Sequence, residues 1–136
     1  MWADLRSGWA KILLRQGQQK LRLALLKDGC QCAVTGETTE SVLEAAHLLP
    51  HADSGSAEPY NAILLRADIH KLFDQGYFDI SADGKVVLEK PFPASSLYVQ
   101  EVSTWEIRLQ KVVPRIAAAL KERAARKARE VKDSIP

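Results

Sequence analysis

The chain has 136 residues, of which 46% are hydrophobic and 26% charged, as expected of one soluble globular domain with a substantial core. It has no apolar run near the roughly 20 residues of a membrane helix, and two cysteines exclude a disulfide framework. Because the early acid Asp4 argues against a secretory signal, we expect a cytoplasmic protein with no membrane contact.

The charge is divided unevenly along the chain. Residues 1–36 carry six Lys/Arg and two Asp (net +4), residues 37–106 carry four Lys/Arg and twelve Asp/Glu (net −8), and residues 107–136 carry nine Lys/Arg and three acids (net +6). Carboxylates suit a metal site but oppose nucleic acid, whereas basic segments suit binding to a phosphate backbone. The alternative is that the basic helices are only solvated surfaces.

The first 29 residues are predicted to form two helices. Apolar residues recur at helical spacing over 3–15, Gly17 interrupts the pattern, and a second helix over 18–27 ends at Asp28-Gly29. Cys30 and Cys32 follow in a short apolar segment. Small buried thiols are the favoured interpretation, since a structural zinc site usually has four ligands.

Residues 30–76 are predicted to contain two short strands and one helix. A strand over 42–47 ends before Pro50, the polar stretch 51–60 is a loop, and 62–65 is a short buried strand. The helix spans 68–75, because three apolar residues fall at positions i, i+3 and i+4: Ile69, Leu72 and Phe73. Gly76 supplies its stop.

The rest of the chain adds a hairpin and a basic helix. Ala82-Asp83-Gly84 is a turn signal within a hairpin over 77–90. Prolines act as breakers across 91–114, and a long Ala-rich helix covers 115–133. Residues 1–136 are therefore expected to form a single α+β domain, with helices at both ends of the core.

Two histidines and a carboxylate make the central segment chemically informative. His70 and Asp74 are four residues apart on one helical face, which is a usable two-ligand platform for a divalent metal; the alternative is a surface His–Asp pair. His47 stands where an apolar strand meets a loop, and a neutral histidine can deprotonate water near pH 7. Asn61 can bond across that loop and hold the His47 backbone.

Four motifs, in order and at fitting spacing, resemble those of the HNH endonuclease family. They are Cys32-Ala-Val-Thr35-Gly36, Leu43-Glu-Ala-Ala-His47-Leu-Leu-Pro50, Asn61-Ala-Ile-Leu-Leu65 and His70-Lys-Leu-Phe73-Asp74-Gln-Gly76. The resemblance covers about residues 15–90. It implies a ββα-metal (His-Me finger) core and hydrolysis of DNA phosphodiester bonds, with His47 as general base, Asn61 orienting it and His70 ligating the metal.

The metal shell departs from the pattern of this family at one position. Many HNH enzymes have an acid or histidine ligand immediately before the base, and here that residue is Ala46. We expect Asp74 to be the second ligand, with waters, Glu44 or His51 as the alternatives. Such a shell suits Mg²⁺ or Mn²⁺, although Ni²⁺ or Zn²⁺ can also bind at a histidine site.

Three further residues are candidates for contacts with nucleic acid. Arg66 could reach the scissile phosphate and stabilise its developing charge; the alternative is a surface arginine paired with Asp68 or Glu44. Lys71 and the loop residue His51 could touch DNA, and a solvated loop histidine is the alternative for His51.

Two other functions remain open at this point. The same scaffold could serve as a non-catalytic DNA-binding or partner-binding module, an interpretation to which Ala46 gives weight. The nuclease could also be the toxic part of a defence or competition system, held inactive by a regulatory partner protein. A homodimer would help to make double-strand breaks.

Overall fold

The computed structural model describes residues 2–49, 59–107 and 112–133. Its main elements, in chain order, are α1 (Trp2–Asp28), β1 (Leu43–His47), β2 (Ala62–Arg66), α3 (Ala67–Asp74), β3 (Phe78–Ile80), β4 (Val86–Leu88), α4 (Tyr98–Glu101) and α5 (Val112–Asp133). Short 3-10 turns lie at Glu40–Val42, Pro59–Asn61 and Val102–Thr104. Helices combined with small antiparallel sheets confirm the prediction of an α+β architecture.

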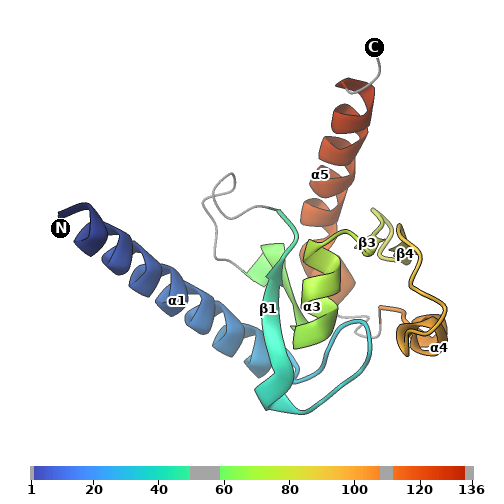
Figure 1. The fold of residues 1–136 in the computed structure, drawn as a ribbon, viewed down its shortest axis with the longest axis horizontal. Coiled ribbons are helices and arrows are strands. Elements are labelled where there is room, and N and C mark those ends of the chain that lie inside the picture. Colours follow the sequence, from blue (N-terminus) through green and yellow to red (C-terminus); the bar gives the residue numbers. More distant parts are fainter. Residues whose placement is uncertain (1, 50–58, 108–111, 134–136) are drawn as a thin grey trace.

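The centre of the fold is a two-stranded hairpin followed at once by a helix. β1 and β2 pair antiparallel, with Leu43 opposite Arg66 and His47 opposite Ala62. α3 begins at the residue after β2 and packs beside the hairpin, while α1 and α5 lead away from it in different directions (Figure 1). This arrangement places the loop end of the hairpin, where His47 lies, between the two long helices.

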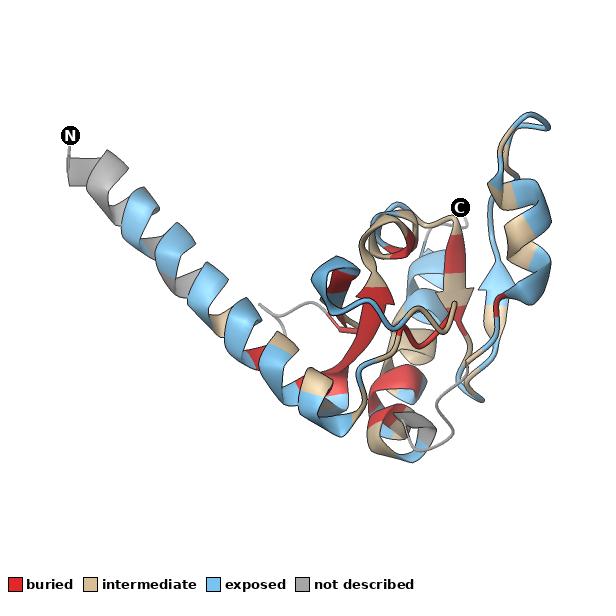
Figure 2. Ribbon diagram, turned by 90° about the horizontal axis from the view of Figure 1, so that it is seen from below, coloured by how far each residue is buried: buried red, intermediate tan, exposed pale blue. Residues whose placement is uncertain are grey.

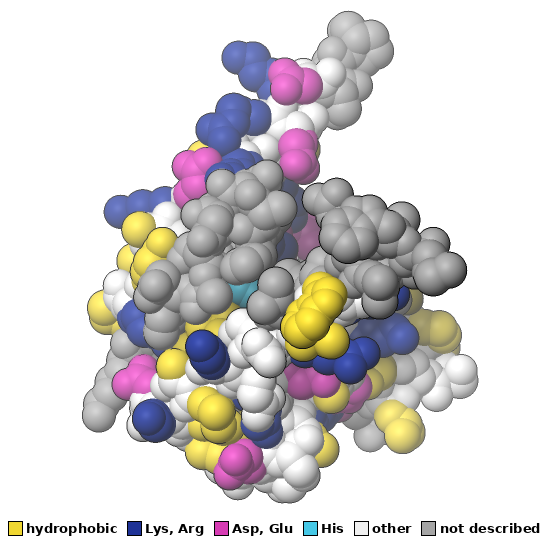
Figure 3. Space-filling model, turned by 90° about the vertical axis from the view of Figure 1, so that its left-hand side faces the viewer, with side chains coloured by type: hydrophobic (Ala, Val, Ile, Leu, Met, Phe, Trp, Pro, Cys, Tyr) yellow, Lys and Arg dark blue, Asp and Glu magenta, His cyan; other side chains and the backbone are white. Residues whose placement is uncertain are grey.

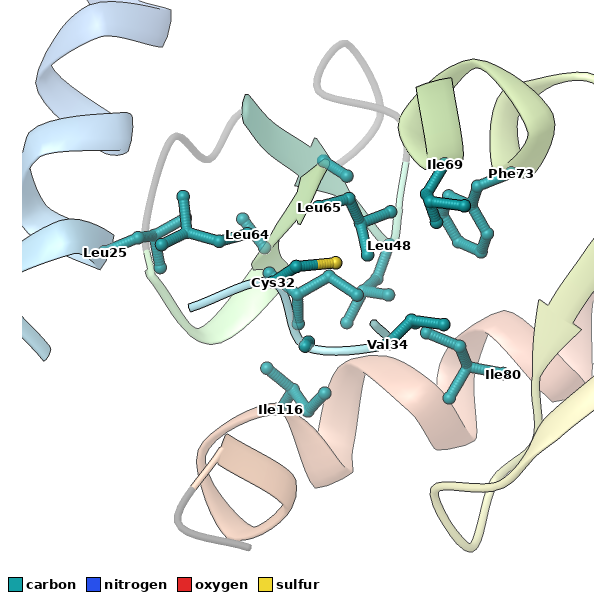
Figure 4. Close-up of a cluster of buried hydrophobic side chains, with 14 of the residues drawn as sticks. Leu25, Cys32, Val34, Leu48, Leu64, Leu65, Ile69, Phe73, Ile80 and Ile116 are labelled. Atoms are coloured by element: carbon teal, nitrogen blue, oxygen red, sulfur yellow. The ribbon is translucent and has the colours of Figure 1, made fainter. Parts of the chain in front are cut away.

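One apolar core joins elements that are far apart in the sequence. Figure 4 shows Leu25 of α1, Leu64 and Leu65 of β2, Ile69 and Phe73 of α3, and Ile116 of α5 around Cys32 and Val34. Fully burying a leucine or isoleucine side chain stabilises the folded state by roughly 1.5–3 kcal/mol. Removing these side chains from water therefore fixes α3 and α5 against the hairpin.

The N-terminal region corrects one prediction. A single helix, α1, replaces the two helices predicted over 3–15 and 18–27. Gly17 does not interrupt it, because a glycine inside a helix costs only about 1 kcal/mol relative to alanine. Among the side chains of α1 that the structure describes, Leu21 and Leu25 are buried, and the preceding turns are largely exposed (Figure 2).

Pro114 is a second correction. It was expected to act as a breaker before a helix beginning at residue 115, but it lies in the first turn of α5. Proline is tolerated there because the first N–H groups of a helix have no intrahelical acceptor. Within the described residues, no helix has the length and apolarity needed to cross a membrane.

The other predicted elements are confirmed with small shifts in their ends. The strand expected at 62–65 is β2, the helix expected at 68–75 is α3, and the hairpin expected over 77–90 consists of β3 and β4. Gly76 has a φ of +77°, and its N–H donates to the Phe73 carbonyl at 3.1 Å. A left-handed glycine therefore ends α3, as the sequence predicted.

Candidate active site

His47 and Asn61 lie at the two ends of the loop that connects the strands. His47 is the last residue of β1, and its Nε2 atom is shielded from solvent. Asn61 is fully buried: its Oδ1 accepts the Leu49 N–H at 2.8 Å, and its Nδ2 donates to the Leu49 carbonyl at 3.2 Å. The Asn61 carbonyl also accepts the Leu48 N–H at 2.9 Å. Asn61 thus holds the backbone that immediately follows His47.

α3 presents His70 and Asp74 because the adjacent side of the helix is anchored in the core. Ile69 and Phe73 are buried, so His70 and Asp74 lie at the edge of that contact. The Nε2 atom of His70 is 3.3 Å from Oδ2 of Asp74, and its Nδ1 atom is 2.8 Å from Oε1 of Glu44 on β1. The imidazole therefore lies between two carboxylates that come from different elements.

One cleft contains the three main candidates. It has a volume of about 360 Å³, and its lining includes His47, His70, Asp74 and Arg123. It shares Gln18, Ala45 and His70 with a groove of about 570 Å³ between α1 and β1. Figure 3 shows histidine surface recessed near the centre of one face of the molecule. The general base and the proposed metal ligands thus open onto the same hollow.

Arg123 of α5 is the cleft residue that the sequence analysis missed. Its Nε donates to Asp79 Oδ1 at 2.8 Å, and its Nη1 donates to the Leu48 carbonyl at 2.6 Å. The guanidinium also lies over the ring of Phe73, 4.6 Å from the ring centroid. A sequence signal for it exists, since Arg123 extends the i, i+3, i+4 stripe of the buried residues Ile116, Ala119 and Leu120 by one further turn.

Asp79 pairs with Arg123 in a largely buried position. Burial by itself raises the pKa of this carboxyl, because it penalises the charged form. The hydrogen bond and positive charge of Arg123, the Ile80 N–H and the Lys127 ammonium together outweigh burial, so the pKa of Asp79 lies below its ordinary value of 3.8. The carboxylate is therefore ionised at neutral pH and holds the Arg123 side chain in place.

Arg66 lies in a separate ion-pair network. Its Nε donates to Asp68 at 2.6 Å and its Nη2 donates to Glu101 at 2.6 Å, while the Tyr98 hydroxyl donates to Asp68 at 2.6 Å. The bond from Arg66 holds the pKa of Asp68 below its ordinary value, and burial together with the bond to Asp68 raises the pKa of Tyr98 to about 12. An ion pair with Asp68 was the alternative given for Arg66 in the sequence analysis, and this pair is present. A phosphate contact by Arg66 stays a prediction.

The remaining candidates lie in different surroundings. Lys71 is exposed on α3 beside His70, and His51 lies outside the described residues. Cys30 is exposed, whereas Cys32 is buried and its Sγ accepts the N–H groups of Thr35 and Arg66, both at 3.3 Å. The expectation of small buried thiols is therefore confirmed for Cys32 and wrong for Cys30.

The donor chemistry of the cleft fits a divalent cation, although the shell is incomplete. An imidazole nitrogen with a carboxylate oxygen is a usual ligand pair, and His70 Nε2 with Asp74 supplies it. Among the described residues, no three His, Cys, Asp or Glu side chains are already arranged to hold a metal ion. Ala46, at the position of a ligand in many HNH enzymes, is fully buried.

Comparison with known proteins assigns the central part of the chain. Residues 32–81 match the family model described as HNH endonuclease, a match that spans β1, β2, α3 and β3. No curated protein matches the chain. HNH nucleases generally use a divalent metal ion. His47, Asn61, His70 and Asp74 all lie in this segment, so residues 32–81 are a segment of the HNH endonuclease type.

Proposed function

We propose that the protein is a metal-dependent endonuclease that hydrolyses DNA phosphodiester bonds in the cleft beside β1 and α3. The observation that supports this most is that His47, His70 and Asp74, all within the segment matched to the nuclease family, line one cleft. The core would then be a ββα-metal (His-Me finger) unit built from β1, β2 and α3.

In this proposal His47 is the general base. A neutral imidazole with an ordinary pKa of about 6.5 accepts a proton from water at physiological pH, and the water then attacks the phosphorus. The base must stay in one place relative to the phosphate, since small displacements are costly to catalysis. The bonds from Asn61 to Leu49 support this placement from the adjacent backbone.

His70 and Asp74 are the proposed ligands of the cation, which we expect to be Mg²⁺ or Mn²⁺, with Ni²⁺ or Zn²⁺ as alternatives. When bound, a divalent cation stabilises the charge on the phosphate and on the leaving oxygen. Glu44 holds the other ring nitrogen of His70. Partners of this kind fix the orientation of a ligating histidine, so Glu44 is proposed as a positioning residue.

The carboxylates of Glu44 and Asp74, beside His70, repel DNA, so most of the grip on DNA must come from neighbouring basic elements. The groove between α1 and β1 has Arg15 and Arg22 in its lining and meets the cleft at His70. Arg22 donates to the carbonyls of Leu43 and Glu40, whereas Arg15 is exposed. On α5, by contrast, several basic side chains are already paired with carboxylates: Arg123, Arg126, Lys127 and Arg129. We therefore propose that DNA approaches along α1, with Lys71 as a further contact.

The proposed function is tested with supercoiled plasmid and purified protein. Mg²⁺ or Mn²⁺ should produce nicked or linear plasmid, EDTA should prevent it, and both His47→Ala and His70→Ala should abolish it while the circular dichroism spectrum is retained. Gln75→Ala, an exposed change just after α3, is the matched control and should cut normally. Full activity of folded His47→Ala would refute the role proposed for His47.

A non-catalytic DNA-binding module is the second candidate, favoured by one observation. The buried Ala46 offers no ligand where many HNH enzymes have one. This candidate predicts DNA binding that weakens steeply with salt, and no cleavage with any divalent metal. The plasmid experiment, repeated with Mg²⁺, Mn²⁺, Ni²⁺ and Zn²⁺, therefore separates the two functions.

A further inference from the structure

Arg123 enters the cleft from an element outside the segment matched to the HNH family. The match ends at residue 81, whereas Arg123 belongs to α5. Among the described residues that line the cleft, Arg123 is the one with a permanently cationic side chain. Its neighbours there include His47, His70 and Asp74, so a single guanidinium shares the hollow with the proposed base and both proposed metal ligands.

The guanidinium is held in a fixed position. Asp79 binds Nε, the Leu48 carbonyl binds Nη1, and the Phe73 ring lies against the cation. Leu48 directly follows His47, so Arg123 and the proposed base are linked by one short stretch of backbone. Nη2 forms no hydrogen bond with any described residue, which leaves N–H donors available to a ligand.

The charges around Arg123 do not cancel its effect on the cleft. Asp79 also binds Lys127 at 3.1 Å, and Lys127 in turn binds Glu89. The two positive side chains, Arg123 and Lys127, thus face two negative ones, Asp79 and Glu89, and the net charge of the four is zero. However, of the four residues Arg123 alone lines the cleft. The hollow therefore faces a positive group, while Asp79, Glu89 and Lys127 line a neighbouring pocket on the other side of Arg123.

We propose that Arg123 is a further catalytic residue, whose guanidinium binds the scissile phosphate in the cleft. Arginine donates paired hydrogen bonds to phosphate oxygens. A donor that is already oriented stabilises the charge developing on those oxygens without rearrangement during the reaction. The inference rests on the proposed nuclease function and extends it to a residue of α5.

The test compares Arg123→Gln, Arg123→Lys and wild type in single-turnover cleavage of a duplex oligonucleotide with saturating Mn²⁺. Removing one preorganised donor of this kind lowers a rate by about 100-fold, so we expect that loss for Arg123→Gln and a smaller loss for Arg123→Lys. Arg129→Gln, on the same helix, is the matched control, because Arg129 is exposed and binds Glu122. It should cleave within about twofold of wild type.

Two readouts separate the phosphate contact from a structural role. A lost phosphate contact lowers the rate by the same factor at every pH, whereas a displaced His47 shifts the pH at which the rate falls. Urea unfolding reports whether each variant is folded. If Arg123→Gln is not folded, the cleavage rate of the Arg123→Lys variant decides whether Arg123 binds the phosphate. Wild-type rates in the folded Arg123 variants would overturn the inference alone, while a wild-type protein that never cuts DNA would overturn the proposed function.

Discussion

The Nδ1 atom of His70, on α3, lies 2.8 Å from Oε1 of Glu44, on β1. The pair spans the interface between the strand that ends in the proposed base and the helix that carries the proposed metal ligands. A proton on Nδ1 that is donated to Glu44 leaves the Nε2 lone pair available beside Asp74, 3.3 Å away. The contact thus couples the geometry of β1 to the proposed metal site.

Glu44→Gln is expected to weaken metal binding. The neutral amide is a poorer acceptor for the Nδ1 proton, and loss of such a partner typically lowers metal affinity by about 10-fold or more. Isothermal titration with Mn²⁺ measures the change directly. Glu40→Gln is the matched control, since its exposed side chain lies one short turn before β1. Equal affinities for wild type and Glu44→Gln would show that Glu44 does not support His70.

Asn61→Ala is expected to lower the free energy of unfolding by about 1–3 kcal/mol. The change leaves the N–H and carbonyl of the buried Leu49 without the Asn61 side chain as their partner. Cleavage should fall as well, because the backbone after His47 loses its support. Urea unfolding gives the stability change, with Gln75→Ala as the exposed control. A stability within 0.5 kcal/mol of wild type, a typical surface effect, would contradict the prediction.

Arg66→Gln separates the two roles considered for this residue. Its pairs with Asp68 and Glu101 are partly exposed and screened, so we expect the free energy of unfolding to fall by only about 1 kcal/mol. Because those pairs already engage the guanidinium, single-turnover cleavage by the folded variant should stay within about threefold of wild type. A loss of about 100-fold in cleavage rate would instead assign Arg66 to the scissile phosphate.

Asp79 is expected to contribute to unfolding in acid. Its pKa in the folded protein is below the ordinary value of 3.8, so its ion pairs stabilise the fold above that pH. This contribution is lost as the pH falls from about 3.8 through the lower folded-state pKa. Urea unfolding of wild type and Asp79→Asn at pH 7 and pH 3 tests this, because the stability difference between the two proteins should shrink at pH 3. A difference that is independent of pH would exclude the linkage.

Patterns in the sequence correctly predicted those elements whose formation depends only on residues close together in the chain. α3 follows from the spacing of Ile69, Leu72 and Phe73, and its end from Gly76, because helix faces and left-handed turns are local properties. The same reasoning failed at Gly17, since the cost of a helical glycine is small enough for α1 to continue. Local signals therefore indicated the kinds of element more reliably than their ends.

The sequence by itself determined the order of strand, loop, strand and helix, and placed the motif residues His47, Asn61, His70 and Asp74 within the segment that matches the family model. Only the tertiary structure decided that Glu44 meets His70, that Arg66 pairs with Asp68 and Glu101, and that Arg123 reaches the Leu48 carbonyl, 75 positions earlier in the chain. The reason is physical: each contact joins elements that only burial of the shared core brings together. Burial of Ile116 and Leu120, for example, carries Arg123 of α5 to the cleft, and periodicity along one helix does not say which surface that helix will cover.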